Sequence, residues 1–463
     1  MLVHRIVFTL VLFLYATNSL KVQVGKSRSG ISFVPEIRKN LKLPVWPVWG
    51  GVLAQLADWT GNTKLSELIV KNIGGRVVPI SLGDMDVSPF LLLAHHAHSF
   101  TPFDPIRALT TLFLPEGFPA HPHAGFDTVT YCINGGLIHR DSNGLKMSYG
   151  DGDVQWMRAG RGIIHEEMWN TKPDKNQMKH QRIEIYQLWI NLPKSDKFSP
   201  PTATRIFSSD IPICTGKNGE IIRVICGTLS ASSSFSSSGA QENERDRSSN
   251  NEREREKGES ISGPGNKLIV SPVSVLHITL PPHTSLPLSV SLGDTVVTYV
   301  RQGSLMVSDE ENDDEIPSNN KQERERERER RHGSVPVTAG DCVCYRSPSN
   351  INIRSERDTR ERVGCSTVLT AGEEGLDALV MLGTPIPEPV VWRGPFVQAS
   401  RSDFIRAAES FDSIGMKAYW DYQMTDSMWQ EHIKKVNVGD AIDRFLKLGK
   451  YSTDEDLVSY YEE

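Results

Sequence analysis

The stretch that decides the fold runs from residue 117 to 169 and reads GFPAHPHAGFDTVTYCINGGLIHRDSNGLKMSYGDGDVQWMRAGRGIIHEEMW. Short β-rich segments in it are separated at 135–136, 142–144 and 150–152 by Gly, Asn, Asp and Ser, the residues that favour tight turns. This alternation is typical of a β-meander. We therefore expect the chain around this stretch to form an antiparallel β structure.

Two short motifs in this stretch contain side chains that bind metals. His121 and His123 belong to a His-Pro-His triplet, and His165 and Glu167 belong to a later His-Glu-Glu triplet. Alternate residues of a strand point to the same face, so each of these two pairs shares a face, and Glu166 points away. If the meander folds so that both faces meet, three imidazoles and one carboxylate converge. We interpret this arrangement as a metal site.

The ligand types favour a reactive metal over a structural one. Neutral imidazoles with a carboxylate suit first-row metals such as Fe, Mn, Ni, Cu or Zn, and four protein ligands leave positions open on an octahedral ion. The alternative is that His121, His123 and His165 are ordinary barrel histidines satisfied by hydrogen bonds. Two same-face pairs flanked by this glycine pattern favour the metal site over that alternative.

Five separate blocks of sequence resemble the pirin family, and they occur in the family's order. The blocks are HPHAGFDTVTY (121–131), HRDSNG (139–144), GDVQWMRAGRGIIHEE (152–167), LWINLP (188–193) and EPVVWRGPFV (388–397). The resemblance extends over residues 86–411, with inserts. It implies an all-β bicupin: two jelly-roll β-barrels of the cupin type in one chain, with short N- and C-terminal helical extensions.

The resemblance also implies one non-haem iron, Fe2+, in the N-terminal barrel, with His121, His123, His165 and Glu167 as its ligands. This ligand set accepts other divalent first-row metals as well. The sequence departs from the family's motifs at two places. Ala124 and Asp127 replace the family's Arg and Glu, and SPFLLLAHH (88–96) replaces DPFLLLDHF.

The pattern divides the chain into five parts. We expect a signal sequence at 1–19, a leader and N-terminal extension with a short helix at 20–75, a metal-binding barrel at 76–200, a metal-free barrel at 201–400 and a helical tail at 401–463. The second barrel is predicted to be metal-free because it contains no His-x-His or His-x-Glu pair. Its Ser-rich or charged inserts, 230–266 and 308–333, are predicted to be disordered.

Several smaller features carry expectations of their own. The cluster His95, His96 and His98 is predicted to lie in a loop near the barrel mouth, and His139 on a hairpin. Ser402 is predicted to cap the first helix of the tail. The rest of the tail is interpreted as a pair of surface helices, with a partner-binding appendage as the alternative. The six cysteines are scattered and are interpreted as small buried hydrophobes.

Composition limits partners and location. A net charge of −6 and a pI near 6.1 argue against nucleic-acid binding. The apolar run IVFTLVLFLYA is shorter than the ~20 residues of a membrane-spanning helix, so it predicts entry into the secretory pathway and no span in the mature protein. The basic segment after it resembles a transit peptide. Delivery to a plastid by a bipartite leader and simple secretion are therefore both open.

Function follows from the resemblance. Some pirin-like proteins resemble quercetin 2,3-dioxygenases, which implies O2 and a flavonol-type or other enolic aromatic molecule as substrates. Glu167 would be a ligand, a general base, or both in turn. The alternative is an iron- and redox-dependent protein-binding or regulatory module without catalysis, for which the tail would offer a partner surface.

Overall fold

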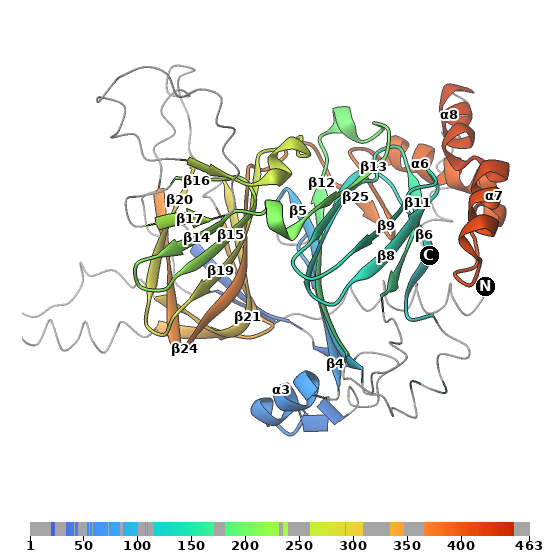
Figure 1. The fold of residues 1–463 in the computed structure, drawn as a ribbon. Coiled ribbons are helices and arrows are strands. Elements are labelled where there is room, and N and C mark those ends of the chain that lie inside the picture. The colour runs from blue at the N-terminus through green and yellow to red at the C-terminus, as the bar shows by residue number, and fades with distance from the viewer. Residues whose placement is uncertain are drawn as a thin grey trace, which may run out of the picture.

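The computed structural model contains two β-barrels side by side, with helices at the outer side of the first barrel (Figure 1). This confirms the predicted all-β class with helical extensions. The structure describes residues 20–23, 34–40, 42–44, 53–54, 56–57, 59–72, 74–83, 87–100, 107, 109, 115–170, 181–230, 235–238, 260–291, 293–308, 334–346 and 365–448. The predicted signal sequence lies outside these residues and stays a prediction.

The first barrel pairs a seven-stranded sheet with a four-stranded sheet. The larger sheet has the order β13-β10-β7-β12-β5-β4-β3, and the smaller one has the order β6-β11-β8-β9. The strands of the larger sheet are β3 (Leu43–Pro44), β4 (Gly75–Ser81), β5 (Phe90–Phe100), β7 (Phe126–Asn134), β10 (Val154–Arg158), β12 (Gln181–Asn191) and β13 (Thr202–Ile206). Those of the smaller sheet are β6 (Gly117–His123), β8 (Leu137–Asp141), β9 (Lys146–Tyr149) and β11 (Ile163–Trp169).

The second barrel is built on one large sheet. Its order is β1-β2-β23-β21-β24-β19-β15-β14-β17, with β20 beside β24 and β22 beside β21. The strands are β1 (Leu20–Gln23), β2 (Val34–Lys39), β14 (Ile213–Gly216), β15 (Ile221–Cys226), β17 (Phe235–Ser238), β19 (Val273–Leu280), β20 (Ser285–Val290), β21 (Thr295–Ser308), β22 (Ser334–Thr338), β23 (Cys342–Arg346) and β24 (Cys365–Gly383). Apolar side chains such as Val224, Ile278 and Val380 form the core between these strands.

Strand pairing crosses the boundaries expected from the sequence at several places. β2 belongs to the predicted extension, yet it pairs with β23 and completes the second barrel. β13 falls in the range predicted for the second barrel, yet it pairs with β10 in the first. Parts of the first predicted insert, 230–266, form strands, because β17 pairs with β14 and β18 (Ser260–Ser262) pairs with β16 (Thr228–Ser230). The second insert, 308–333, lies outside the described residues except for Ser308, so its disorder stays a prediction.

The two barrels share a buried interface. Val129 and Leu188 of the first barrel and Val275 and Leu379 of the second belong to one apolar cluster. Alternate residues of a strand point to opposite faces. The larger sheet therefore buries one face against the second barrel and the other face inside the first barrel. The interior face of that sheet is the one that contributes to the candidate site.

The histidine cluster of residues 95–98 is not in a loop, so that prediction was wrong. All eleven residues of β5 are buried, and the strand pairs with β4 on one side and β12 on the other. His95 faces the second barrel, where its Nδ1 lies 2.8 Å from the hydroxyl of Tyr299. His96 and His98 face the opposite way, into the first barrel, where they contact Trp169.

Three helices of the tail pack on the outer face of the smaller sheet (Figure 1). They are α6 (Arg401–Ile414), α7 (Asp426–Val436) and α8 (Val438–Leu448). Ser400, not Ser402, caps α6, because its Oγ accepts a hydrogen bond from the Asp403 backbone N–H at 3.1 Å. Another helix, α3 (Thr63–Asn72), lies beside β4 and β5. No helix among the described residues is long and apolar enough to cross a membrane.

The tail is anchored to the strands that carry the candidate ligands. Ile164 of β11 packs in one apolar cluster with Phe411 and Trp429. The carboxylate of Glu166 accepts hydrogen bonds from Arg140 and from the indole of Trp420, the latter at 2.7 Å. Glu166 therefore faces away from the barrel interior, as predicted, and the tail stabilises the outer face of β11.

A buried lysine ties the C-terminal segment to the first barrel. The Nζ of Lys197 donates to the carbonyls of Gly125 at 2.9 Å and Val397 at 3.1 Å and to the Asn191 side chain at 2.6 Å. The backbones approach so closely that a Cβ on Gly125 would lie 1.8 Å from the Val397 carbonyl oxygen. Burial lowers the pKa of Lys197 from 10.5 to about 7, opposed by the charges of Glu388 and Asp403.

This lysine makes stability depend on pH in a defined direction. Between pH 7 and 10.5 the unfolded chain holds a proton on Lys197 that the folded protein has released, so the free energy of unfolding contributed by this group rises with pH. We expect the free energy of unfolding of wild type, measured relative to that of Lys197→Met, to increase from pH 7 to pH 9. Urea denaturation at each pH measures it. The exposed Lys194→Met is the control, and parallel profiles for wild type and both variants would contradict the expectation.

Candidate metal centre

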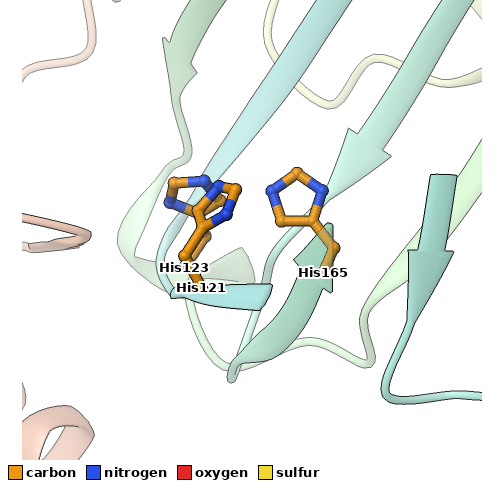
Figure 2. Close-up of side chains that lie close together, drawn as sticks. All are labelled: His121, His123 and His165. Carbon is orange, nitrogen blue, oxygen red and sulfur yellow. The ribbon is translucent and has the colours of Figure 1, made fainter. Parts of the chain in front are cut away.

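Three histidines converge inside the first barrel (Figure 2). His121 and His123 come from β6 and His165 from the neighbouring strand β11, where His165 pairs with His121 and Ile163 with His123. One ligand nitrogen from each ring lies within 4.8 Å of the others, and all three residues are buried. The ring centroids of His165 lie 4.4 Å from His121 and 5.0 Å from His123.

An irregularity in β6 helps to aim His121. The pairing with β11 shifts register between His165 and Glu167, because Glu167 pairs with Phe118 and one extra residue of β6 is accommodated. Such bulges re-aim side chains and are frequent next to active sites. At this point the Nδ1–H of His121 donates to the Pro119 carbonyl at 2.8 Å. A metal would therefore bind through Nε2, since a metal-binding histidine usually donates its other ring N–H to a carbonyl or carboxylate.

Burial keeps the three rings neutral. It lowers the pKa of His121 to about 4, where the Pro119 hydrogen bond opposes the shift and His139 adds to it. Burial also places the pKa values of His123 and His165 well below their ordinary range, with further lowering by the neighbouring histidines. Neutral imidazoles are the form that binds metals.

The residues fit a divalent metal. Both ring nitrogens of His165 and both of His123 are buried without a hydrogen-bond partner in the described part of the chain. A buried polar atom without a partner costs about 1–3 kcal/mol, so such atoms call for a ligand. A metal ion between the three rings would satisfy one nitrogen of each. Among the described residues, no other group of His, Cys, Asp and Glu side chains meets the same geometric requirement.

Glu167 lies inside the barrel beside the triad, held by hydrogen bonds. Its Oε1 accepts from the hydroxyls of Tyr149 at 2.9 Å and Thr130 at 3.3 Å, and its Oε2 accepts from the amide of Gln187 at 2.7 Å. Burial raises the pKa of Glu167, and the charge of His139 and these hydrogen bonds oppose the rise. The three nitrogens that lie within 4.8 Å of one another do not include this carboxylate, so its role as a fourth ligand stays a prediction.

A chain of hydrogen bonds continues from Glu167 to His139, whose ring centroid lies 5.4 Å from that of His165. The Tyr149 hydroxyl also lies 2.8 Å from Gln155 Oε1, and Gln155 Nε2 lies 2.7 Å from His139 Nδ1. His139 Nε2 lies 3.0 Å from Asp141 Oδ2. This places His139 on the hairpin strand β8, as expected, with a supporting role. Sequence reasoning missed Tyr149, Thr130 and Gln187, because their meeting depends on how the two sheets pack.

The departures from the family's motifs lie mostly away from the metal centre. Ala124 packs against the helices of the tail, and Asp127 accepts hydrogen bonds from Trp156 at 2.9 Å and from Arg158. Two departures lie nearer to it. Ala94 packs in one cluster with Trp189, whose ring lies 5.1 Å from that of His123. His96 lies 5.3 Å from the ring of Phe118, which in turn lies 6.5 Å from that of His121.

Known proteins resemble the chain in sequence and fold. The family model for pirin matches residues 78–190. A candidate pirin-like protein of Arabidopsis thaliana is 30% identical over 289 residues, which cover 62% of this chain and 79% of the relative. A candidate quercetin 2,3-dioxygenase of Pseudomonas aeruginosa is 28% identical over 330 residues, with 71% and 86% covered. A crystal structure of quercetin 2,3-dioxygenase from Acinetobacter baumannii covers 73% of this chain and 90% of its own, with a TM-score of 0.50 and 25% identity.

Proposed function

Because this chain belongs to the pirin family, we propose that it is a metal-dependent dioxygenase that acts on a flavonol-type or other enolic aromatic substrate. The observation that carries the proposal is the convergence of three neutral, buried histidines, two of which, His123 and His165, have ring nitrogens without a partner in the described part of the chain. The relatives named as quercetin 2,3-dioxygenases support the substrate class. The Fe2+ of the family's pattern is the metal we propose.

His121, His123 and His165 would hold the metal, with Glu167 as the proposed fourth ligand. Bound there, the ion would supply Lewis acidity and redox chemistry towards the substrate oxygen and O2. The chain's own contribution is to hold the substrate next to the triad and to accept its proton. Glu167 is the acceptor we propose, because its raised pKa makes its carboxylate a stronger base than an exposed one.

Tyr149 controls where that proton can reside. Its hydroxyl has one hydrogen but lies within hydrogen-bond distance of two acceptors, Gln155 Oε1 and Glu167 Oε1. When Glu167 is ionised, Tyr149 donates to Glu167. When Glu167 has taken the substrate's proton on Oε1, it donates to the Tyr149 oxygen, which in turn donates to Gln155. The network therefore accommodates both protonation states of Glu167 without moving its carboxylate.

The experiment that tests the function is turnover of a flavonol by the metal-loaded protein. We expect 3-hydroxyflavone to be consumed with an equal amount of O2, no consumption under nitrogen, and loss of activity on chelation that metal restores. Glu167→Gln should abolish turnover, whereas the exposed Glu374→Gln on the second barrel should not change it. A protein that carries one metal per chain and leaves the flavonol unchanged in O2 would contradict the proposal and favour the non-catalytic regulatory module.

Removing the Tyr149 hydroxyl tests the proton network. Loss of an outer hydrogen-bond partner at a metal site costs about 10–100-fold in activity or metal affinity. We expect Tyr149→Phe to lower kcat about 10-fold or more while the folded protein still binds metal. Tyr131→Phe is the matched control, because its hydroxyl contacts His277 at the interface between the barrels at 2.9 Å. Equal kcat values for Tyr149→Phe and wild type would show that the hydroxyl has no part in the reaction.

A further inference from the structure

His98 is a buried polar residue of the first barrel. Only 3% of the residue is exposed, and neither ring nitrogen has a hydrogen-bond partner among the residues that the structure describes. A neutral imidazole carries one N–H donor and one acceptor nitrogen, and leaving both unpaired in the interior costs free energy that a phenyl ring would not. The pKa of His98 is far below its ordinary range because of burial and the nearby His96 and His95, so the ring does not gain stability as a cation.

Aromatic rings surround this histidine. The centroid of Trp169 lies 4.8 Å from that of His98, and Phe100 lies 5.6 Å away on the same strand. Trp169 in turn packs edge-on against Phe118 at 5.5 Å. These rings offer flat apolar faces, while the two nitrogens of His98 offer the unsatisfied polar atoms.

The cluster lies between the histidine triad and one end of the barrel. β5 and β11 end at Phe100 and Trp169, and β6 begins at Gly117. Phe118 connects the cluster to the triad, since its ring lies 6.5 Å from that of His121 and 5.3 Å from that of His96. The cluster therefore adjoins the triad on the side of this end of the barrel.

The chemistry of the cluster selects the ligand. Flat aromatic walls favour a planar ring, and a neutral donor–acceptor pair favours a hydroxyl group, which can both accept and donate. Arg107 lies over the Phe100 ring at 4.4 Å, but its guanidinium is paired with Glu116. A carboxylate or phosphate is disfavoured because burial penalises a charge that this already paired cation would not neutralise.

We propose that His98, Trp169 and Phe118 form a subsite that binds a neutral, hydroxylated aromatic ring of the substrate, remote from the atoms that face the triad. This inference rests on the proposed function, because it assumes that an aromatic substrate reaches the triad. It makes His98 a specificity-determining residue. One ring nitrogen of His98 forms a hydrogen bond with the ring's hydroxyl, and His98 takes no part in the reaction at the triad.

A matched pair of ligands and one variant test the subsite. 3-Hydroxyflavone and 3,4'-dihydroxyflavone share the end expected at the metal and differ by one hydroxyl on the far ring. We expect the metal-loaded protein, without O2, to bind the dihydroxy compound about 10-fold more tightly, as one net hydrogen bond allows. In His98→Phe the two Kd values should become equal, because the Kd of the dihydroxy compound rises. Isothermal titration measures both.

Two further measurements test the subsite if the binding data for His98→Phe are weakened by poor folding. Trp169→Phe should raise the Kd values of both compounds by a similar factor and leave the ratio of the two Kd values unchanged. Without any ligand, His98→Phe should raise the Tm by about 2 °C or more, since it removes two unpaired buried nitrogens.

The outcomes separate this inference from the function on which it rests. An unchanged preference for the dihydroxy compound in His98→Phe would overturn the subsite, even where 3-hydroxyflavone is still turned over. Binding of neither compound to wild type would overturn both the subsite and the proposed flavonol oxygenation.

Discussion

His165→Ala is expected to lower flavonol turnover and metal affinity at least 100-fold. Loss of a mere outer hydrogen-bond partner costs about 10–100-fold at metal sites, so loss of one of three nitrogen ligands costs more. His165 is the ligand that β11 contributes, and both of its nitrogens are unpartnered in the described chain. Metal titration of the purified variant and its turnover of 3-hydroxyflavone measure the two effects.

The control for this variant is His283→Asn. His283 is exposed on the second barrel with a φ of 57°, a conformation that Asn tolerates. This substitution should change neither metal affinity nor turnover. Circular dichroism should show that both variants retain the β structure. If His165→Ala bound metal as tightly as wild type, the triad would not be the metal site.

Arg301→Met is expected to lower the free energy of unfolding by about 3–5 kcal/mol, the usual cost of removing one partner from a buried ion pair. Arg301, on β21 of the second barrel, donates to both carboxylate oxygens of Glu184 in the first barrel, at 2.6 and 3.1 Å, and to Asp377 at 3.0 Å. Burial opposes ionisation of Glu184, but His95 and Arg301 together hold its pKa well below its usual range. The variant would leave Glu184 with less compensation for its buried charge.

Chemical denaturation of the metal-loaded protein measures this loss. Replacing Glu184 as well, in Arg301→Met with Glu184→Gln, removes the unpaired charge and should recover part of the stability. Since the folded-state pKa of Glu184 is depressed, its contribution is present above pH 4.5 and is lost as the pH falls, so Arg301→Met should be less destabilising in acid. A change below about 1 kcal/mol at neutral pH would show that the network contributes as little as an exposed pair does.

Strand periodicity sufficed to predict the triad. His121 and His123 had to share a face, and His165 could reach them because two neighbouring strands of a meander bury the same face. The same rule placed Glu167 inside the barrel and Glu166 outside. The hydrogen-bond partners of Glu167 could not be predicted, because Gln187 and Tyr149 come from different sheets. Their contact with Glu167 depends on how the sheets pack across the barrel.

Histidines and serines misled the prediction where local patterns are ambiguous. The cluster His95, His96 and His98 was predicted to lie in a loop near the barrel mouth, yet His95 finds partners at the interface and His96 and His98 are buried as neutral rings. Ser400 and Ser402 both suit a helix start. Ser400 is the cap because Asp403 is three residues on, and its carboxylate and backbone N–H both bond the Ser400 hydroxyl.

Long-range strand pairing accounts for the remaining difference between the predicted and the observed barrel boundaries. β2 carries alternating polar residues that give no local sign of a barrel strand, and its partner β23 lies about three hundred residues later in the chain. The fold class itself was predictable, because turn signals and alternating apolar residues recur through both barrels.

The metal content of the purified protein tests the central claim most directly. Elemental analysis after loading with Fe2+ under anaerobic conditions should find about one metal ion per chain, as expected for three neutral imidazoles in one buried site. The same one-to-one ratio is expected when Mn2+, Ni2+ or Zn2+ replaces iron, since this ligand set accepts them. A protein that remains free of metal after loading with each of these ions would contradict the account.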